Sequence, residues 1–232
     1  MRIDSHQHFT REYLPSLLLP ILKRNRFDGT VVVTHLPSVE ETRWLFGLAS
    51  QYDFLRAVVG WADLNAPALN GILDEYQRHP KFRGLIWSGE AAPGMAELER
   101  RGLSLDLLSG DPAPIAQRYP ALRMAVVYSG TTPVPALSSH VFLKISGLIT
   151  GRPTRWKAAD FQPAIRAALA SYGPERIMYG SDWPSYLPDG TWKEALAAFT
   201  QAIGAQSLET REQLLGDTAR RFYRIASPDT GE

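Results

Sequence analysis

The chain has 232 residues, and its 25 lysines and arginines against 24 aspartates and glutamates give a net charge of +1. This balance provides no overall electrostatic case for nucleic acid or an anionic membrane, and we expect neither partner. The absence of cysteine excludes disulfides and thiolate ligands, so His, Asp and Glu are the available metal ligands. The sequence shows no signal-peptide pattern and no run of eighteen apolar residues, which makes a cytoplasmic protein the expectation.

Short apolar runs recur roughly every twenty to thirty residues and alternate with segments of helical spacing, a rhythm typical of βαβ units. The strands are expected at residues 2–9, 30–35, 55–61, 82–87, 103–108, 123–128, 141–145 and 176–179. The helices are expected at residues 13–22, 39–51, 66–78, 95–101, 112–119, 160–172, 191–203 and 208–223.

Eight apolar strands, most of them followed by a helix, predict an α/β protein with a (β/α)8 TIM barrel. An open, doubly wound sheet is the alternative. Residues 129–140 are rich in Thr and Pro and near the minimum length for a parallel crossover, so we expect a shortened crossover without a full helix and a somewhat distorted barrel. One domain is expected over residues 1–226, with a disordered tail at 227–232.

Polar residues occupy every second position of the first expected strand. Asp4, His6 and His8 would therefore line one face, with the two imidazoles about 7 Å apart along the strand. Two histidines so placed could bind one ion or one substrate. The alternative is an exposed edge strand whose histidines have no chemical role.

Asp182 follows the last expected strand, which in a TIM barrel is the neighbour of the first. Catalytic groups of this fold lie at the carboxyl ends of the strands, so Asp182 would meet His6 and His8 there. A carboxylate beside two imidazoles can complete a metal site, with His6, His8 and Asp182 as ligands, or act as a general base on water.

Other side chains could surround the same pocket. Lys144 and Ser146 share a face of the seventh strand; the sixth ends in Tyr128 and the second in His35. We expect Lys144 to act with the histidines, or to form a salt bridge with Asp106 or Asp182. An apolar wall for a ring is expected from three tryptophans, with core packing as the equal alternative: Trp61, Trp87 and Trp183. For Tyr128 we expect either a contact with the substrate or packing in the core. For His35 we expect either a contact with the substrate or a position just outside the residues that contact it.

Five motifs, in this order, resemble the amidohydrolase-related family, in the branch of 2-pyrone-4,6-dicarboxylate lactonase and the sugar-acid lactonases. They are residues 4–9 (DSHQHF), 58–64 (VVGWADL), 143–148 (LKISGL), 178–184 (MYGSDWP) and 217–223 (DTARRFY). The resemblance implies a TIM-barrel hydrolase acting on a small-molecule substrate. It also implies the first-strand ligand positions for His6 and His8, and the position of the water-activating base for Asp182.

The chain departs from this family at the end of the sixth strand, where the family has Asp-His before a glycine and residues 127–130 read VYSG. Either His35 replaces the missing histidine as a ligand or the protein works without a metal; the cofactor is thus one divalent metal, zinc, or none. The leading expectation is a lactonase that opens a small cyclic ester with water activated by Asp182. A metal-dependent decarboxylase and a catalytically degenerate barrel that binds a small molecule are the alternatives. A homo-oligomer is compatible with the sequence.

Overall fold

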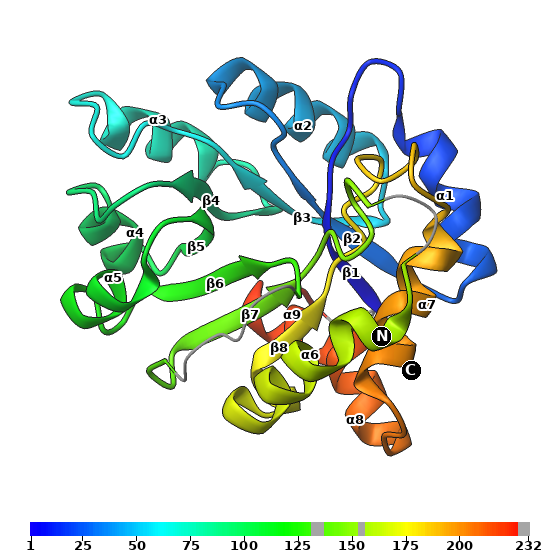
Figure 1. Cartoon of the computed structure of the whole chain (residues 1–232). Coiled ribbons are helices and arrows are strands. Elements are labelled where there is room, and N and C mark those ends of the chain that lie inside the picture. The colour runs from blue at the N-terminus through cyan, green and yellow to red at the C-terminus, as the bar shows by residue number, and fades with distance from the viewer. Residues whose placement is uncertain (131–136, 153–155, 227–232) are drawn as a thin grey trace, which may run out of the picture.

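The fold is known from a computed structural model that describes residues 1–130, 137–152 and 156–226. Eight parallel strands pair in chain order (Figure 1). They are β1 (Ile3–Gln7), β2 (Gly29–Val33), β3 (Leu55–Gly60), β4 (Phe82–Ser88), β5 (Ser104–Ser109), β6 (Arg123–Tyr128), β7 (Val141–Ile145) and β8 (Ile177–Tyr179). The end of β1 and the segment that follows β8 close the barrel, because the Asp182 amide donates to the His6 carbonyl at 2.8 Å. The predicted TIM barrel is confirmed.

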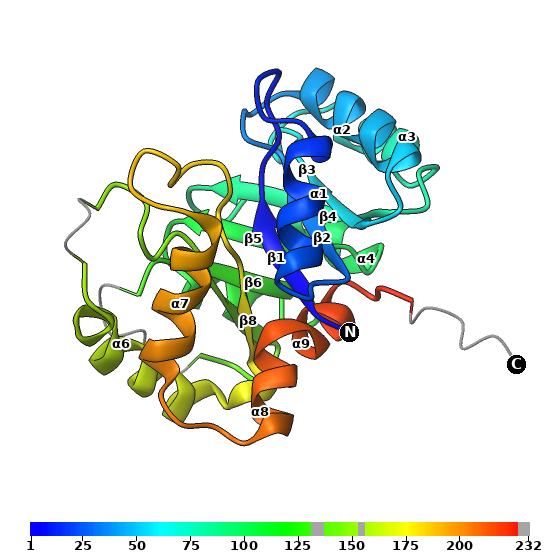
Figure 2. The ribbon, with the colours of Figure 1, turned by 90° about the vertical axis from the view of Figure 1, so that its right-hand side faces the viewer.

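Helices lie outside the strands and connect them (Figure 2). They are α1 (Pro15–Arg24), α2 (Val39–Gln51), α3 (Leu69–Tyr76), α4 (Met95–Arg100), α5 (Pro112–Arg118), α6 (Ala158–Tyr172), α7 (Trp192–Ile203), α8 (Leu208–Glu212) and α9 (Thr218–Phe222). A 3-10 turn, Pro174–Arg176, precedes β8. None of the helices in the described ranges is long and apolar enough to cross a bilayer.

The last predicted helix differs from the structure. A π-helical segment, η2 (Gln213–Asp217), separates α8 from α9. Within it, a Cβ added to Gly216 would lie 2.1 Å from the Met1 carbonyl oxygen, so only glycine lets the N-terminal strand approach this closely. The π-helical segment η2 thus allows the C-terminal helical region to pack closely against the residues at the start of β1.

The connection between β6 and β7 contains no helix in the part that the structure describes. Residues 131–136 lie outside that part, so the predicted short crossover is tested only at its two ends. The tail predicted at residues 227–232 also lies outside the described residues.

Side chains alternate between the inside of the barrel and the helix layer, as they must in a strand. One buried cluster belongs to the barrel interior and includes Val31, Val33, Val59, Ala125 and Met178. A larger cluster packs the other face of the strands against the helices. Since both faces are buried, the strands have the near-continuous apolar pattern from which the fold was predicted.

Candidate functional site

A pocket of about 800 Å³ opens at the carboxyl ends of the strands, where sites of this fold lie. Several predicted site residues contribute to its wall: His6, His8, His35, Trp61, Trp87, Ser146 and Asp182. They come from segments at or just beyond β1, β2, β3, β4, β7 and β8. The pocket thus brings together residues that are far apart in the sequence.

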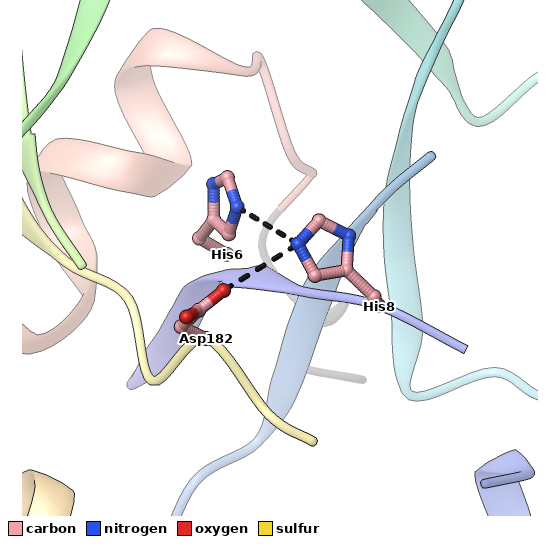
Figure 3. Close-up of side chains that lie close together, drawn as sticks. All are labelled: His6, His8 and Asp182. Carbon is pink, nitrogen blue, oxygen red and sulfur yellow. Dashed lines mark hydrogen bonds and ion pairs between the residues drawn. The ribbon is translucent and has the colours of Figure 1, made fainter. Parts of the chain in front are cut away.

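His6, His8 and Asp182 form a compact cluster at one side of this pocket (Figure 3). The Nε2 atoms of the two histidines are 3.2 Å apart, and His8 Nε2 is 3.5 Å from Asp182 Oδ1. One potential ligand atom from each residue lies within 4.8 Å of the others. Among the described residues this is the one such group of three His, Asp or Glu side chains.

Asp4 does not lie with the two histidines, although strict alternation predicted a shared face. The pairing of β1 with β2 shifts register between Asp4 and Gln7, which interrupts the alternation. Asp4 instead accepts a hydrogen bond from the Ser181 amide at 2.8 Å and one from Trp192 Nε1 at 3.3 Å. Complete burial raises the pKa of this carboxyl to about 6. Asp4 therefore ties β1 to the segment after β8 rather than lining the pocket.

The orientation of His8 is set by a backbone carbonyl. His8 Nδ1 lies 2.8 Å from the oxygen of Val33, at the end of β2. Because a carbonyl can only accept, Nδ1 carries the proton, and the lone pair of neutral His8 is on Nε2, toward His6 and Asp182. A carbonyl partner of this kind also orients metal-ligating histidines.

His6 is fully buried, and burial lowers the pKa of its imidazole well below the usual value, with the charge of Lys144 and then His8 adding to the effect. Its ring is therefore neutral at physiological pH. Its Nδ1 atom has no hydrogen-bond partner among the described residues. Gly180 makes room for this side chain, since a Cβ at that position would lie 2.5 Å from the His6 Cβ.

Asp182 is held from both its backbone and its side chain. It has a φ of 66°, which is uncommon for a non-glycine residue, and its amide donates to the His6 carbonyl. Thr150 Oγ1 donates to Asp182 Oδ2 at 2.7 Å, which leaves Oδ1 facing His8. Thr150 was not predicted, because it lies in the loop after β7 where no periodicity indicates which side chains turn inward.

Lys144 lies outside the pocket wall. Its side chain is fully buried in β7 and pairs with Asp106 of β5, one of the two salt bridges considered from the sequence. Tyr223, just after α9, donates to the same carboxylate at 2.9 Å. Burial lowers the pKa of Lys144 and raises that of Asp106. Because its ammonium is buried in this pair, Lys144 does not line the pocket. Its effect on the site is electrostatic, since its positive charge helps to lower the pKa of His6.

Three other predicted residues divide between the pocket and the core. Tyr128 and Trp183 belong to the core cluster on the helix side of the strands, and the Trp183 ring packs edge-on against Phe9 at 5.9 Å. Neither lines the pocket. His35 lines the pocket, with its ring centroid 5.2 Å from that of His8, but it supplies no atom to the cluster of His6, His8 and Asp182.

The sequence analysis did not single out Asp63 as a site residue. Asp63 accepts a hydrogen bond from the Asn65 amide at 2.9 Å in the loop between β3 and α3, and it also lines the pocket. Its position two residues beyond Trp61 was the available signal. The remaining polar lining side chains come from the last residue of β4, Ser88, and from loops that have no such spacing: Thr34, Ser129 and Ser185.

The cluster fits a divalent metal. Two nitrogens bonded to one tetrahedral zinc at 2.0–2.1 Å are separated by about 3.3 Å, and the two Nε2 atoms are 3.2 Å apart. Two histidines and one carboxylate are also a ligand set that catalytic zinc sites use, with a further position open for water. The third histidine missing from the sixth strand is thus not needed for a three-ligand site.

The amidohydrolase family profile matches residues 3–225, and the chain belongs to this family. It is a hydrolase, as predicted from the five motifs. The chain is 30% identical to L-fucono-1,5-lactonase of Burkholderia ambifaria, over 98% of this chain and 97% of that protein. It is 28% identical to the L-fucono-1,5-lactonase of Burkholderia multivorans, with the same coverage.

Solved structures agree with this assignment. An amidohydrolase from Burkholderia multivorans with bound zinc superposes with a TM-score of 0.87 at 28% identity, covering 97% of this chain and all of that one. A protein described as a 2-pyrone-4,6-dicarboxylic acid hydrolase from Pseudomonas putida superposes with a TM-score of 0.77 at 23% identity, covering 98% of each chain. The second likeness supports the fold alone.

Proposed function

We propose that this protein is a lactonase that opens a small cyclic ester at the His6–His8–Asp182 cluster. The observation that carries the proposal is the position of this cluster. It places a carboxylate oxygen and two imidazole nitrogens on the wall of an open pocket. A water molecule held there would be within reach of a base and of groups that polarise a carbonyl.

The proposed substrate is a sugar-acid lactone, of the kind named for the two L-fucono-1,5-lactonases. The pocket has the two surfaces that such a ring needs. Trp61, Ile86 and Trp87 offer apolar area to a ring face. Ser146, Thr150 and Asp63 offer polar atoms to ring hydroxyls, and the Ser146 hydroxyl has no partner among the described residues.

In the proposed reaction, Asp182 Oδ1 accepts a proton from water while the water oxygen attacks the lactone carbonyl. Thr150 keeps the other carboxylate oxygen engaged, so the base presents one oxygen in one direction. The tetrahedral adduct then collapses, the ring C–O bond breaks, and the proton returns from Asp182 to the departing ring oxygen. The product is the open hydroxy acid, and atoms and charge balance.

A divalent metal would be held by His6, His8 and Asp182, and zinc is the metal that the relative from Burkholderia multivorans contains. When bound, such an ion lowers the pKa of water and polarises the substrate carbonyl. The contact with Val33 leaves the Nε2 lone pair of His8 available to it. Neutral His6 would offer its own Nε2 lone pair in the tautomer that carries the proton on Nδ1, an atom without a partner among the described residues. Asp182 supplies the negative charge of the ligand set.

The proposal is tested with a panel of five- and six-membered sugar lactones, including L-fucono-1,5-lactone. Ring opening is followed by a pH indicator at the same pH for protein loaded with zinc and for protein stripped by a chelator. We expect zinc-dependent turnover of at least one six-membered lactone. Absence of turnover across the panel in both forms would contradict the proposal, and release of CO2 from a carboxylated ring would favour the decarboxylase instead.

A further inference from the structure

Three arginines gather at the end of the barrel opposite the pocket, where every parallel strand begins. Arg83 is the second residue of β4 and Arg123 the first of β6, and these strands flank β5. Arg224 follows α9, and its guanidinium packs on Gly102, just before β5, where a Cβ would lie 3.3 Å from Nη1. We call these three residues the arginine cluster. Figure 2 shows the chain after α9 passing below α4.

Arg83 and Arg123 are half-buried and Arg224 is exposed, and none of the three has an acidic partner among the described residues. None of the ion pairs between described residues includes Arg83, Arg123 or Arg224. Arg83 donates from Nη1 to the Pro80 and Phe82 carbonyls, and its Nε is buried without a partner in the described structure. The Arg123 guanidinium lies 5.3 Å from the Phe222 ring centroid. The three positive charges are therefore not neutralised by any described carboxylate.

The three charges also affect one another. Burial lowers the pKa of Arg123 to about 10, and the charges of Arg224 and Arg83 contribute to this shift. The pKa of Arg83 is lowered by burial and by Arg224. Arg224 itself has a φ of 49°, an uncommon backbone state for a non-glycine residue, and its guanidinium lies over Gly102. Repulsion among the three like charges has an energetic cost in the free protein that a bound anion would reduce.

We propose that the arginine cluster binds a multiply charged oxyanion, a phosphate or carboxylate group, at the amino-terminal end of the barrel. Guanidinium groups present paired donors that match the oxygens of such groups. Arg123 and Arg83 come from the sheet, whereas Arg224 comes from the segment after α9. A bound anion would therefore fasten the C-terminal helix to β4 and β6. This site is separate from the pocket, and its test does not depend on the proposed lactonase activity.

The experiment measures the melting temperature in inorganic phosphate and in sodium chloride of equal ionic strength and pH. The proteins are wild type, Arg224→Gln, Arg123→Gln and the control Arg78→Gln, which removes an exposed arginine just beyond α3. We expect phosphate to raise the melting temperature of wild type and control by about 3 °C at several times its dissociation constant. The rise should fall below half in each cluster variant. Arg224→Gln should also melt no lower than wild type in chloride, because it relieves repulsion.

An equal phosphate effect in all four proteins would show a general solvent effect and overturn the proposal, as would no rise in wild type. A parallel series in citrate separates the two sources of oxyanion. Stabilisation by phosphate alone supports a phosphate-bearing ligand, whereas stabilisation by both, again lost in the cluster variants, supports any multiply charged oxyanion. Titration calorimetry with inorganic phosphate would give one site per wild-type chain and none in Arg224→Gln.

Discussion

Asp182 depends on Thr150 for its orientation. The hydroxyl donates to one carboxylate oxygen at 2.7 Å, while the other oxygen faces His8. The hydrogen bond to a charged group contributes about 1.5–3 kcal/mol where it is made. Thr150 is thus a positioning residue for the proposed base.

We predict that Thr150→Val lowers kcat for lactone hydrolysis by about tenfold or more, because the Asp182 carboxylate loses the hydrogen bond that orients it. A tenfold loss corresponds to about 1.4 kcal/mol, near the lower end of the range for a hydrogen bond to a charged group. Thr150→Ser keeps the hydroxyl and should recover most of the rate. Steady-state kinetics of both variants checks this. Equal losses in the two variants would show that the methyl group matters and not the hydrogen bond.

The histidines and Asp182 could be predicted from sequence because they belong to strand ends, where alternation and topology constrain position. Asp4 was placed on the wrong face, since a bulge between Asp4 and Gln7 cannot be seen in the alternation. Trp61 and Trp87 line the pocket whereas Trp183 packs in the core. The sequence could not distinguish these positions, because an aromatic side chain at a strand end is stable in either environment.

Among elements, the buried group formed by Asp106, Lys144 and Tyr223 connects β5, β7 and the segment after α9. The Lys144 ammonium also lies 5.0 Å from the centroid of the Tyr223 ring. A fully buried charge is tolerated only when it is paired and hydrogen bonded, and here each charge has the other as its partner. The contacts fix the C-terminal segment under the barrel.

We predict that Lys144→Met destabilises the fold by about 3–5 kcal/mol, because it leaves the Asp106 carboxylate buried without its cation. For a protein of this size the melting temperature should drop by at least about 6 °C. The double variant Lys144→Met/Asp106→Leu should recover part of the loss. Chemical denaturation of the two single variants and the double variant checks this, and strictly additive losses would contradict the pairing argument.

At the scale of the whole molecule, the barrel could be predicted because eight apolar strands buried on both faces leave few other architectures. The bounds of α3 were less predictable, since Ala66–Ala68 precede the helix although their composition suits it. The π-helical segment between α8 and α9 could not be predicted either. It contains Gly216, which packs against Met1 at the opposite end of the chain, a contact that local sequence does not indicate.

Metal binding should be visible in global stability. We predict that zinc at about a hundred times its dissociation constant raises the melting temperature of wild type by about 5–10 °C, since a ligand of the folded state stabilises it. The rise should be lost in His6→Gln and kept in His79→Gln, whose histidine lies outside the pocket. A zinc-dependent rise in melting temperature of the same size in both variants would contradict zinc binding at His6.

The most direct test of the central claim is the kcat/KM of Asp182→Asn for the lactone that wild type opens fastest. Asparagine keeps the size of the side chain and removes the base. We predict a loss of about 10²–10⁴-fold, the range for a general base, in a variant that still melts cooperatively. Retention of kcat/KM within a factor of about three would contradict the claim that Asp182 activates water.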